Sequence, residues 1–144
     1  MPTRPVKQLI RNQTVLTATA DMTVAAAAAA MRESRVGAIM VVDGERLVGI
    51  FTERDALYRV LANGKNPKLT RLGDVMTLNP TTVTAEMPFG HALHIMYERN
   101  FRHVPVVEDG RPIGMVAVRD ALGPELEQFA EELKEREHIE EILG

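Results

Sequence analysis

The sequence predicts an α/β fold made of two copies of one β-α-β-β-α unit, packed with pseudo-twofold symmetry. Residues 18–57 and 83–122 align without a gap at a constant offset of 65, the spacing from Gly49 to Gly114. The repeat keeps charged residues and glycine as well as apolar residues, so shared composition does not explain it. In the first copy the matching positions include Thr19, Ala20, Met22, Ala27, Met31, Glu33, Val41, Val42, Arg46, Gly49, Arg54, Asp55, Ala56 and Leu57. We therefore expect any binding site to lie where the copies meet.

The first unit begins with a predicted helix over residues 23–34. Its alanine run and Met31 favour helical backbone, and the segment is apolar nearly all round, so we expect it to be buried. One interpretation of Ala25 to Ala30 is close helix–helix contact across a subunit interface. The other, which we favour, is a plain buried helix.

Two strands and a capped helix complete this unit. Residues 36–42 form a continuous apolar run that is typical of a strand covered on both faces. The turn signal Asp43-Gly44 follows, and residues 46–51 read as the partner strand of a possible hairpin. The hydroxyl of Thr52 can cap a helix over residues 53–62, which Asn63-Gly64 ends.

The second unit repeats this order after a polar linker. We expect the first repeat at 6–63, the linker at 64–71, the second repeat at 72–123 and a C-terminal amphipathic helix at 124–144. Leu72 to Met76 opens the second unit with the spacing that Val6 to Ile10 has in the first. Pro88 falls in the first turn of a helix, where its missing N–H costs nothing. Strands are predicted at 104–108 and 112–117.

A last helix is predicted from about Arg119 to Leu143, with a possible break at Gly123-Pro124. Its apolar residues suggest one stripe among many glutamates, formed by Leu126, Phe129, Ala130, Leu133 and Ile142. Two interpretations are equally open: a dimer contact or hinge to a partner, and a solvated amphipathic cap over the module.

Composition excludes several classes of protein. The net charge of −3 argues against broad electrostatic binding of nucleic acid. The chain has no cysteine, so disulfides, thiolate nucleophiles and cysteine metal sites are excluded. Aromatic residues make up only 4%, a weak basis for stacking nucleic-acid bases. The first ten residues contain no long apolar stretch, so we expect no secretory signal, no membrane span and a cytoplasmic location.

Several motifs occur twice and in the same order. Residues 49–55 read GIFTERD and residues 114–120 read GMVAVRD, with Val75-Met76 and residues 103–106 (HVPV) upstream. Over residues 6–123 the chain resembles a tandem pair of cystathionine-β-synthase (CBS) domains, known as a Bateman module. The resemblance implies a regulatory module that binds adenine nucleotides or related adenosyl ligands in two clefts between the copies. It also implies a disc-like homodimer.

The clearest candidate site surrounds Thr52 and Asp55. They stand at the exit of a strand and the start of a helix, where a hydroxyl, amides and the helix dipole can meet a phosphate. Asp55 can accept hydrogen bonds from both ribose hydroxyls. The resemblance places Arg102 and His103 at the phosphates, as a fixed fork of donors and a titratable group. We expect adenine among apolar groups such as Ile50 and Pro105, with backbone near Val83 reading its edge.

The second cleft lacks most of these groups. It keeps Asp120, but Ala117 stands in place of Thr52, and Gly37 and Ala38 occupy the positions of Arg102 and His103. We therefore predict one good nucleotide site and a second cleft that is weak, empty or differently occupied.

Other candidates are weaker. His91 and His94 have a spacing that suits a metal, but no further ligand is placed near them, and we expect no metal site. Arg54 and Arg119 could reach phosphates or pair with nearby glutamates. No Walker-type loop and no nucleophile–base arrangement is present, so we expect no enzyme. The leading ligand is AMP, with ATP, NAD(H) or S-adenosylmethionine as alternatives, and an unidentified regulated protein is a further expected partner. The alternative function is a structural or interaction protein whose clefts are vestigial.

Overall fold

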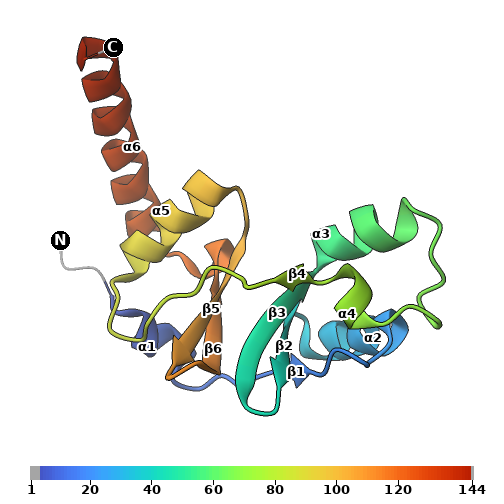
Figure 1. The fold of residues 1–144 in the computed structure, drawn as a ribbon. Helices are drawn as coiled ribbons and strands as arrows, with labels where there is room; N and C mark the ends of the chain where they lie inside the picture. The colour runs from blue at the N-terminus through green and yellow to red at the C-terminus, as the bar shows by residue number, and fades with distance from the viewer. Residues whose placement is uncertain (1–3, 144) are drawn as a thin grey trace.

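The computed structural model describes residues 4–143 and contains two αβ halves with a projecting C-terminal helix (Figure 1). The elements of the first half are α1 (Val6–Ile10), β1 (Thr17–Ala18), α2 (Val24–Ser34), β2 (Ala38–Asp43), β3 (Arg46–Thr52), α3 (Glu53–Asp55) and the π-helical η1 (Ala56–Leu61). Those of the second are α4 (Leu72–Val75), β4 (Thr77–Leu78), α5 (Phe89–Arg99), β5 (His103–Glu108), β6 (Arg111–Ala117), the 3-10 turn η2 (Val118–Asp120) and α6 (Gly123–Leu143). The predicted α/β class is confirmed.

The hairpin that the first unit allowed is present, and the second unit forms one as well. β2 pairs with β3 and β5 with β6, each antiparallel, and each pair contains a register shift at the equivalent place, Val41/Val42 and Val106/Val107. β1 joins β2 in parallel and β4 joins β3, which gives a four-stranded sheet beside a two-stranded one. In the second half a single parallel bridge between Val83 and Val106 stands where β1 pairs with β2.

The short helix that opens each repeat packs on the other repeat. Val6 and Ile10 of α1 lie in the hydrophobic core that contains α5, β5 and β6. Leu72 and Val75 of α4 lie in the core of α2, β2 and β3. The backbone bonds match: Val6 N–H donates to the Met87 carbonyl, and Leu72 N–H to the Met22 carbonyl. This exchange joins the halves, and it draws the chain after α4 across the first repeat.

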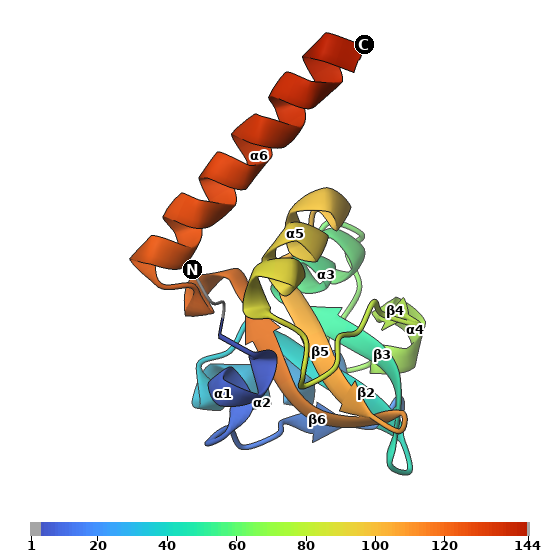
Figure 2. The same ribbon diagram turned by 90° about the vertical axis from the view of Figure 1, so that its left-hand side faces the viewer.

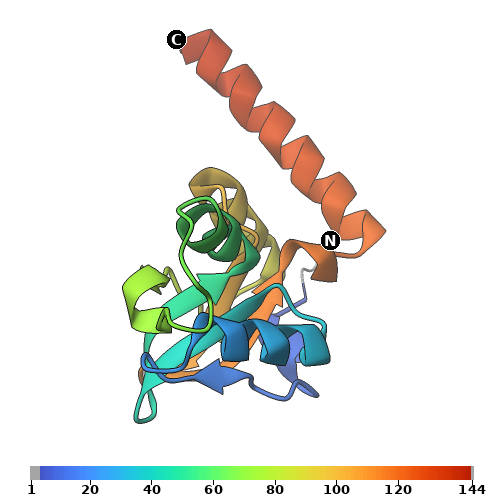
Figure 3. The same cartoon turned by 90° about the vertical axis from the view of Figure 1, so that its right-hand side faces the viewer.

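Helix α2 forms as predicted, but it is not buried all round. The Thr23 hydroxyl accepts from the Ala26 N–H and caps its start. Val24, Ala27 and Met31 face the core, whereas Ala26 and Ala28 are exposed on the outer face. Figure 3 turns α2 toward the viewer. The prediction of full burial is wrong because, within residues 4–143, no element packs over that face.

Three other helices differ from the prediction. The helix after Thr52 turns π-helical from Ala56 to Leu61. Pro88 is the N-cap of α5 rather than part of its first turn. The predicted last helix is two elements, because η2 ends at Asp120 and α6 begins at Gly123.

Helix α6 leaves the body of the molecule (Figure 2). Phe129 lies against Tyr97 and His94 of α5, and Leu133 is half-buried. Ile142 is 68% exposed. It follows Leu133 by nine residues, which at about 100° per residue places it on the opposite face. The single apolar stripe is therefore wrong, and only the first part of α6 covers the module. No helix within residues 4–143 is long and apolar enough to cross a membrane.

Candidate functional site

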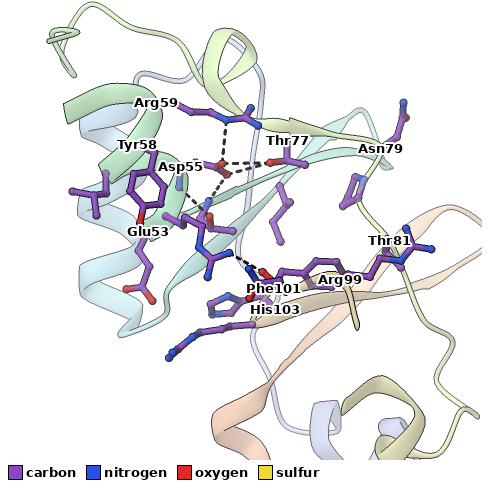
Figure 4. A pocket seen from close by; sticks show the side chains of 17 residues that line it. Glu53, Asp55, Tyr58, Arg59, Thr77, Asn79, Thr81, Arg99, Phe101 and His103 are labelled. Carbon is purple, nitrogen blue, oxygen red and sulfur yellow. Dashed lines mark hydrogen bonds and ion pairs between the residues drawn. The ribbon is translucent and has the colours of Figure 1, made fainter. Parts of the chain in front are cut away.

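The larger cavity lies between the two repeats and has a volume of about 750 Å³ (Figure 4). The first repeat contributes the end of β3, α3 and η1. The chain from β4 to Thr81 crosses one side, and the segment from the end of α5 to the start of β5 forms the other. The lining residues are Ile50, Thr52, Glu53, Arg54, Asp55, Leu57, Tyr58, Arg59, Thr77, Asn79, Pro80, Thr81, Arg99, Asn100, Phe101, Arg102 and His103.

Asp55 is held in place by a reciprocal cap. The Thr52 N–H donates to Oδ2 of Asp55 at 3.0 Å, and the Asp55 N–H donates to Oγ1 of Thr52 at 3.2 Å. Asp55 is 7% exposed and is the one charged residue classed as buried within the described chain. Its Oδ1 makes only long contacts, 3.4 Å to Oγ1 of Thr77 and 3.5 Å to Nε of Arg59. This oxygen can therefore accept a shorter bond from a ligand hydroxyl.

Arg59 places a positive charge beside the Asp55 carboxylate and is itself held by the backbone. Its Nη1 donates to the Met76 carbonyl at 2.9 Å, and its side chain follows Asp55 by one helical turn. Figure 4 shows Asp55 between Arg59 and Thr77. The carboxylate is thus oriented before any ligand arrives.

Arg102 and His103 form the facing wall from the second repeat. α5 ends at Asn100, whose φ of 56° reverses the chain, and the Phe101 N–H returns to the Met96 carbonyl. The next two residues therefore enter β5 at the cavity. Arg102 is exposed, while burial lowers the pKa of His103; the charge of Glu53 opposes that shift.

Within residues 4–143, neither Arg54 nor Arg119 forms an ion pair with a glutamate; Arg54 borders the larger cavity and Arg119 the smaller one, so contact with a phosphate stays a prediction. Nη1 of Arg54 donates to the Asn100 carbonyl at 2.7 Å, and Nη2 of Arg119 donates to the Arg35 carbonyl at 3.1 Å. Asn100 and Arg35 are the left-handed C-caps of α5 and α2. Each arginine therefore clasps the end of the opposite repeat's helix.

Five of the predicted site residues border this one cavity: Ile50, Thr52, Asp55, Arg102 and His103. Val83 and Pro105 do not. The Val83 N–H donates to the Pro105 carbonyl, and its own carbonyl accepts from Val107, so its backbone is already paired inside the second half.

Sequence reasoning missed the side chains that the β4 crossing supplies. Thr77, Asn79, Pro80 and Thr81 line the cavity, as do the rings of Tyr58 and Phe101. The Asn79-Pro80 turn between threonines was the available signal, but it points here only once the chain after α4 is known to cross the first repeat.

A smaller cavity of about 410 Å³ lies at the equivalent place near Asp120. The Ala117 N–H donates to Oδ2 of Asp120 at 2.8 Å, but Ala117 has no hydroxyl to return the cap. Ala38 is fully buried and Gly37 does not border this cavity. Its lining is Gln13, Thr14, Val15, Leu16, Ser34, Val36, Met40, His103, Met115, Ala117, Arg119 and Asp120.

Gln13 closes the sheet edge at this smaller cavity. Its amide donates to the Met115 carbonyl at 2.7 Å and accepts from the Met115 N–H at 3.0 Å. In the first half, backbone of β4 makes the equivalent pairing with Ile50. The two cavities therefore differ in their walls as well as in their polar groups.

His94 serves helix packing. Its Nε2 lies 2.5 Å from Oε2 of Glu132, and its ring centroid lies 4.8 Å from that of Phe129 of α6, with the two rings tilted by 53°. Both partners come from α6, so this histidine fixes the helix to α5.

Comparison with known proteins agrees with this geometry. The family model of the CBS domain matches residues 6–62 and 72–124. The chain therefore belongs to the CBS domain family and carries two copies of the domain.

Relatives and solved structures support the assignment. The chain is 37% identical over 121 residues to the mitochondrial CBS domain-containing protein CBSX3 of Arabidopsis thaliana, covering 81% of this chain and 59% of that protein. It spans only 19% of the meiotically up-regulated gene 70 protein of Schizosaccharomyces pombe, at 31% identity over 93% of this chain.

Among structures, the CBS domain pair of protein MJ0100 in complex with 5′-methylthioadenosine and S-adenosyl-L-methionine has a TM-score of 0.74 at 29% identity, covering 83% of this chain and 93% of that one. The AMP complex of PAE2072 from Pyrobaculum aerophilum has a TM-score of 0.78 at 22% identity, covering 88% and 98%.

Proposed function

We propose that this CBS domain pair is a regulatory module that senses an adenine nucleotide, with an AMP-like ligand in the larger cavity. The observation that carries the proposal is the oriented carboxylate of Asp55, which faces Arg102 and His103 across a cavity of ligand size. A carboxylate suits the ribose hydroxyls, and the basic pair suits a phosphate.

The cavity offers suitable contacts for the ribose, the phosphate and the adenine of the nucleotide. The ribose hydroxyls donate to Oδ1 of Asp55, the oxygen with only long contacts. The phosphate lies near Arg102 and His103. Adenine packs against Ile50 and the Pro80-Thr81 segment of the crossing chain, which replace the expected Pro105 and Val83 wall.

Two other ligands fit the same module. The MJ0100 pair, 29% identical, is in complex with adenosyl compounds, which supports an adenosyl ligand in general. S-adenosylmethionine has a cationic sulfonium and little use for two basic groups, so these groups favour a phosphate. The volume of about 750 Å³ leaves NAD(H) as the second candidate. The AMP-bound structure is only 22% identical and bears on the fold alone.

Binding would act by shifting the two repeats, or two copies of the chain, relative to one another. A ligand can shift such an equilibrium only as far as its affinities for the two states differ. A cavity whose walls come from both repeats provides that difference. The proposal includes a homodimer located in the cytoplasm. It also holds that the protein binds its ligand and does not convert it.

The test is to identify what the protein binds. Small molecules released from the purified chain are identified by mass spectrometry, and AMP, ATP, NADH and S-adenosylmethionine are compared by thermal shift. At equal AMP concentration, we expect AMP to raise the melting temperature of the wild type more than that of Asp55→Ala. Stabilisation by none of the four would favour an interaction protein with vestigial clefts, and turnover of a bound nucleotide would make it an enzyme.

A further inference from the structure

His103 lies between the two cavities. Its side chain borders both the larger cavity of Asp55 and the smaller cavity of Asp120, and no other residue in the described part of the chain lines both. The ring also packs tightly on the first repeat, because a Cβ added to Gly37 would lie 3.1 Å from its Cε1. A change in the charge or position of this ring therefore alters the lining of both cavities.

The charged groups around His103 come from several elements. Burial is the largest influence and lowers the pKa of His103. The charges of Glu53 in α3 and Asp120 in η2 favour the imidazolium and raise this pKa, whereas those of Arg119 in η2 and Arg102, just before β5, lower it further. The equivalent residue of the first repeat is Ala38, which is fully buried and cannot titrate. At this pair of equivalent positions, only the second repeat therefore carries a side chain that can change its charge.

We infer that His103 couples the two cavities, so that a nucleotide phosphate in the larger one alters the chemistry of the smaller one. The inference rests on the proposed function. A phosphate beside the ring stabilises the imidazolium, and the proton is taken up from solvent. The same cation then borders the Asp120 cavity, which becomes less favourable for a cationic ligand and more favourable for an anionic one.

Coupling of this kind is reciprocal. A ligand of the smaller cavity that disfavours the imidazolium must weaken nucleotide binding in the larger one by the same factor. His103 is in this sense a specificity-determining residue for both cavities.

Methyl NMR of the full chain tests the inference, because suitable reporters line each cavity. Ile50 borders only the larger cavity, and Met40 and Met115 only the smaller. Met31 and Met96, in the two hydrophobic cores, are reference methyls. AMP is titrated into wild type, His103→Ala, Asp55→Ala and Asp120→Ala at pH 7.5. The His103→Ala change installs the residue that the first repeat carries at this position.

In the wild type we expect the Ile50, Met40 and Met115 methyls to shift together with AMP, while Met31 and Met96 stay in place. Asp120→Ala keeps all three shifts, which excludes direct binding in the smaller cavity. His103→Ala, at saturation of the Ile50 shift, loses the two methionine shifts.

The failures are distinguishable. In Asp55→Ala all three shifts should move together to higher AMP concentration, because binding is weaker but His103 is intact. Methionine shifts that persist in His103→Ala, or that never occur while Ile50 responds, overturn the coupling and leave the proposed function intact. If Ile50 does not respond in the wild type, AMP does not bind the larger cavity, and both proposals fail.

Discussion

Removal of the Asp55 carboxylate is the sharpest test of the larger cavity. Oδ2 of Asp55 is occupied by the Thr52 N–H at 3.0 Å, whereas Oδ1 has only the long contacts to Thr77 and Arg59. A ribose hydroxyl would therefore gain one charge-assisted hydrogen bond, worth about 1.5–3 kcal/mol. Asp55→Ala should raise the dissociation constant for AMP roughly 10- to 100-fold.

The assay is isothermal titration calorimetry at pH 7.5, with two matched variants. Asp120→Ala removes the equivalent carboxylate of the other repeat and should leave the affinity for AMP within about twofold, because Asp120 borders the smaller cavity and not the larger one. Asp55→Asn keeps the shape and one acceptor without the charge, and should fall between the wild type and Asp55→Ala.

The stability of each variant must be measured, so that a loss of AMP binding is not confused with a loss of folding. Asp55→Ala leaves the Thr52 N–H without a partner, which costs about 1–3 kcal/mol of unfolding free energy, so each variant is first checked by thermal denaturation. A folded Asp55→Ala protein that binds AMP within threefold of the wild type would refute the assignment of this carboxylate to the ribose. Equal losses in Asp55→Ala and Asp120→Ala would refute the inequality of the cavities.

The remaining predictions concern the basic wall and the base of α6. Arg102→Ala should weaken AMP binding roughly 10-fold and leave adenosine binding unchanged in the same calorimeter; equal losses for both would exclude a phosphate role. Burial lowers the pKa of His103 in the free protein, and a bound phosphate raises it, so protons are taken up on binding and AMP affinity should rise as pH falls from 8 to 6.5; His103→Ala should flatten that slope. The hydrogen bond from Arg4 lowers the pKa of Glu125, so the stability it provides is present above the usual glutamate range and is lost as pH falls through the lowered value. Glu125→Gln should therefore reduce the unfolding free energy by about 1 kcal/mol at pH 7 and by less at pH 3, as measured by urea denaturation; the same loss at both pH values would contradict this.

The sequence repeat predicts the scaffold well because it constrains each position twice. Gly49 and Gly114 both lie at the strand register shifts, and Thr52 caps its helix as its residue type requires. Hydrophobic runs and turn residues act locally, so the hairpins follow from them. The same argument placed Ile50, Thr52 and Asp55 correctly on one wall.

Contacts that join distant parts of the chain could not be predicted in this way. Nothing local in the α1 or α4 sequence says that each helix packs on the other repeat, and this exchange decides that Pro80 and Thr81, rather than Val83 and Pro105, border the cavity. Arg54 was ambiguous for the same reason, since its partner is a carbonyl of the opposite repeat. The prediction that Ile142 joins the apolar stripe was wrong for a different reason: its spacing from Leu133 places it on the opposite face of α6.

The repeats share the residues that hold the scaffold together and differ at particular positions around the cavities. The glycines, the aspartates and the arginine clasps, which hold strands and helix ends together, are shared. The differences change what lines each cavity: Thr52 corresponds to Ala117, and Arg102-His103, which line the larger cavity, correspond to Gly37-Ala38, which do not line the smaller one. Because the cavities meet at His103, groups that adapt one cavity to a phosphate also change the wall of the other. Under the coupling inferred for His103, the smaller cavity is more than a weakened copy: we expect its ligand preference to depend on the occupancy of the larger cavity.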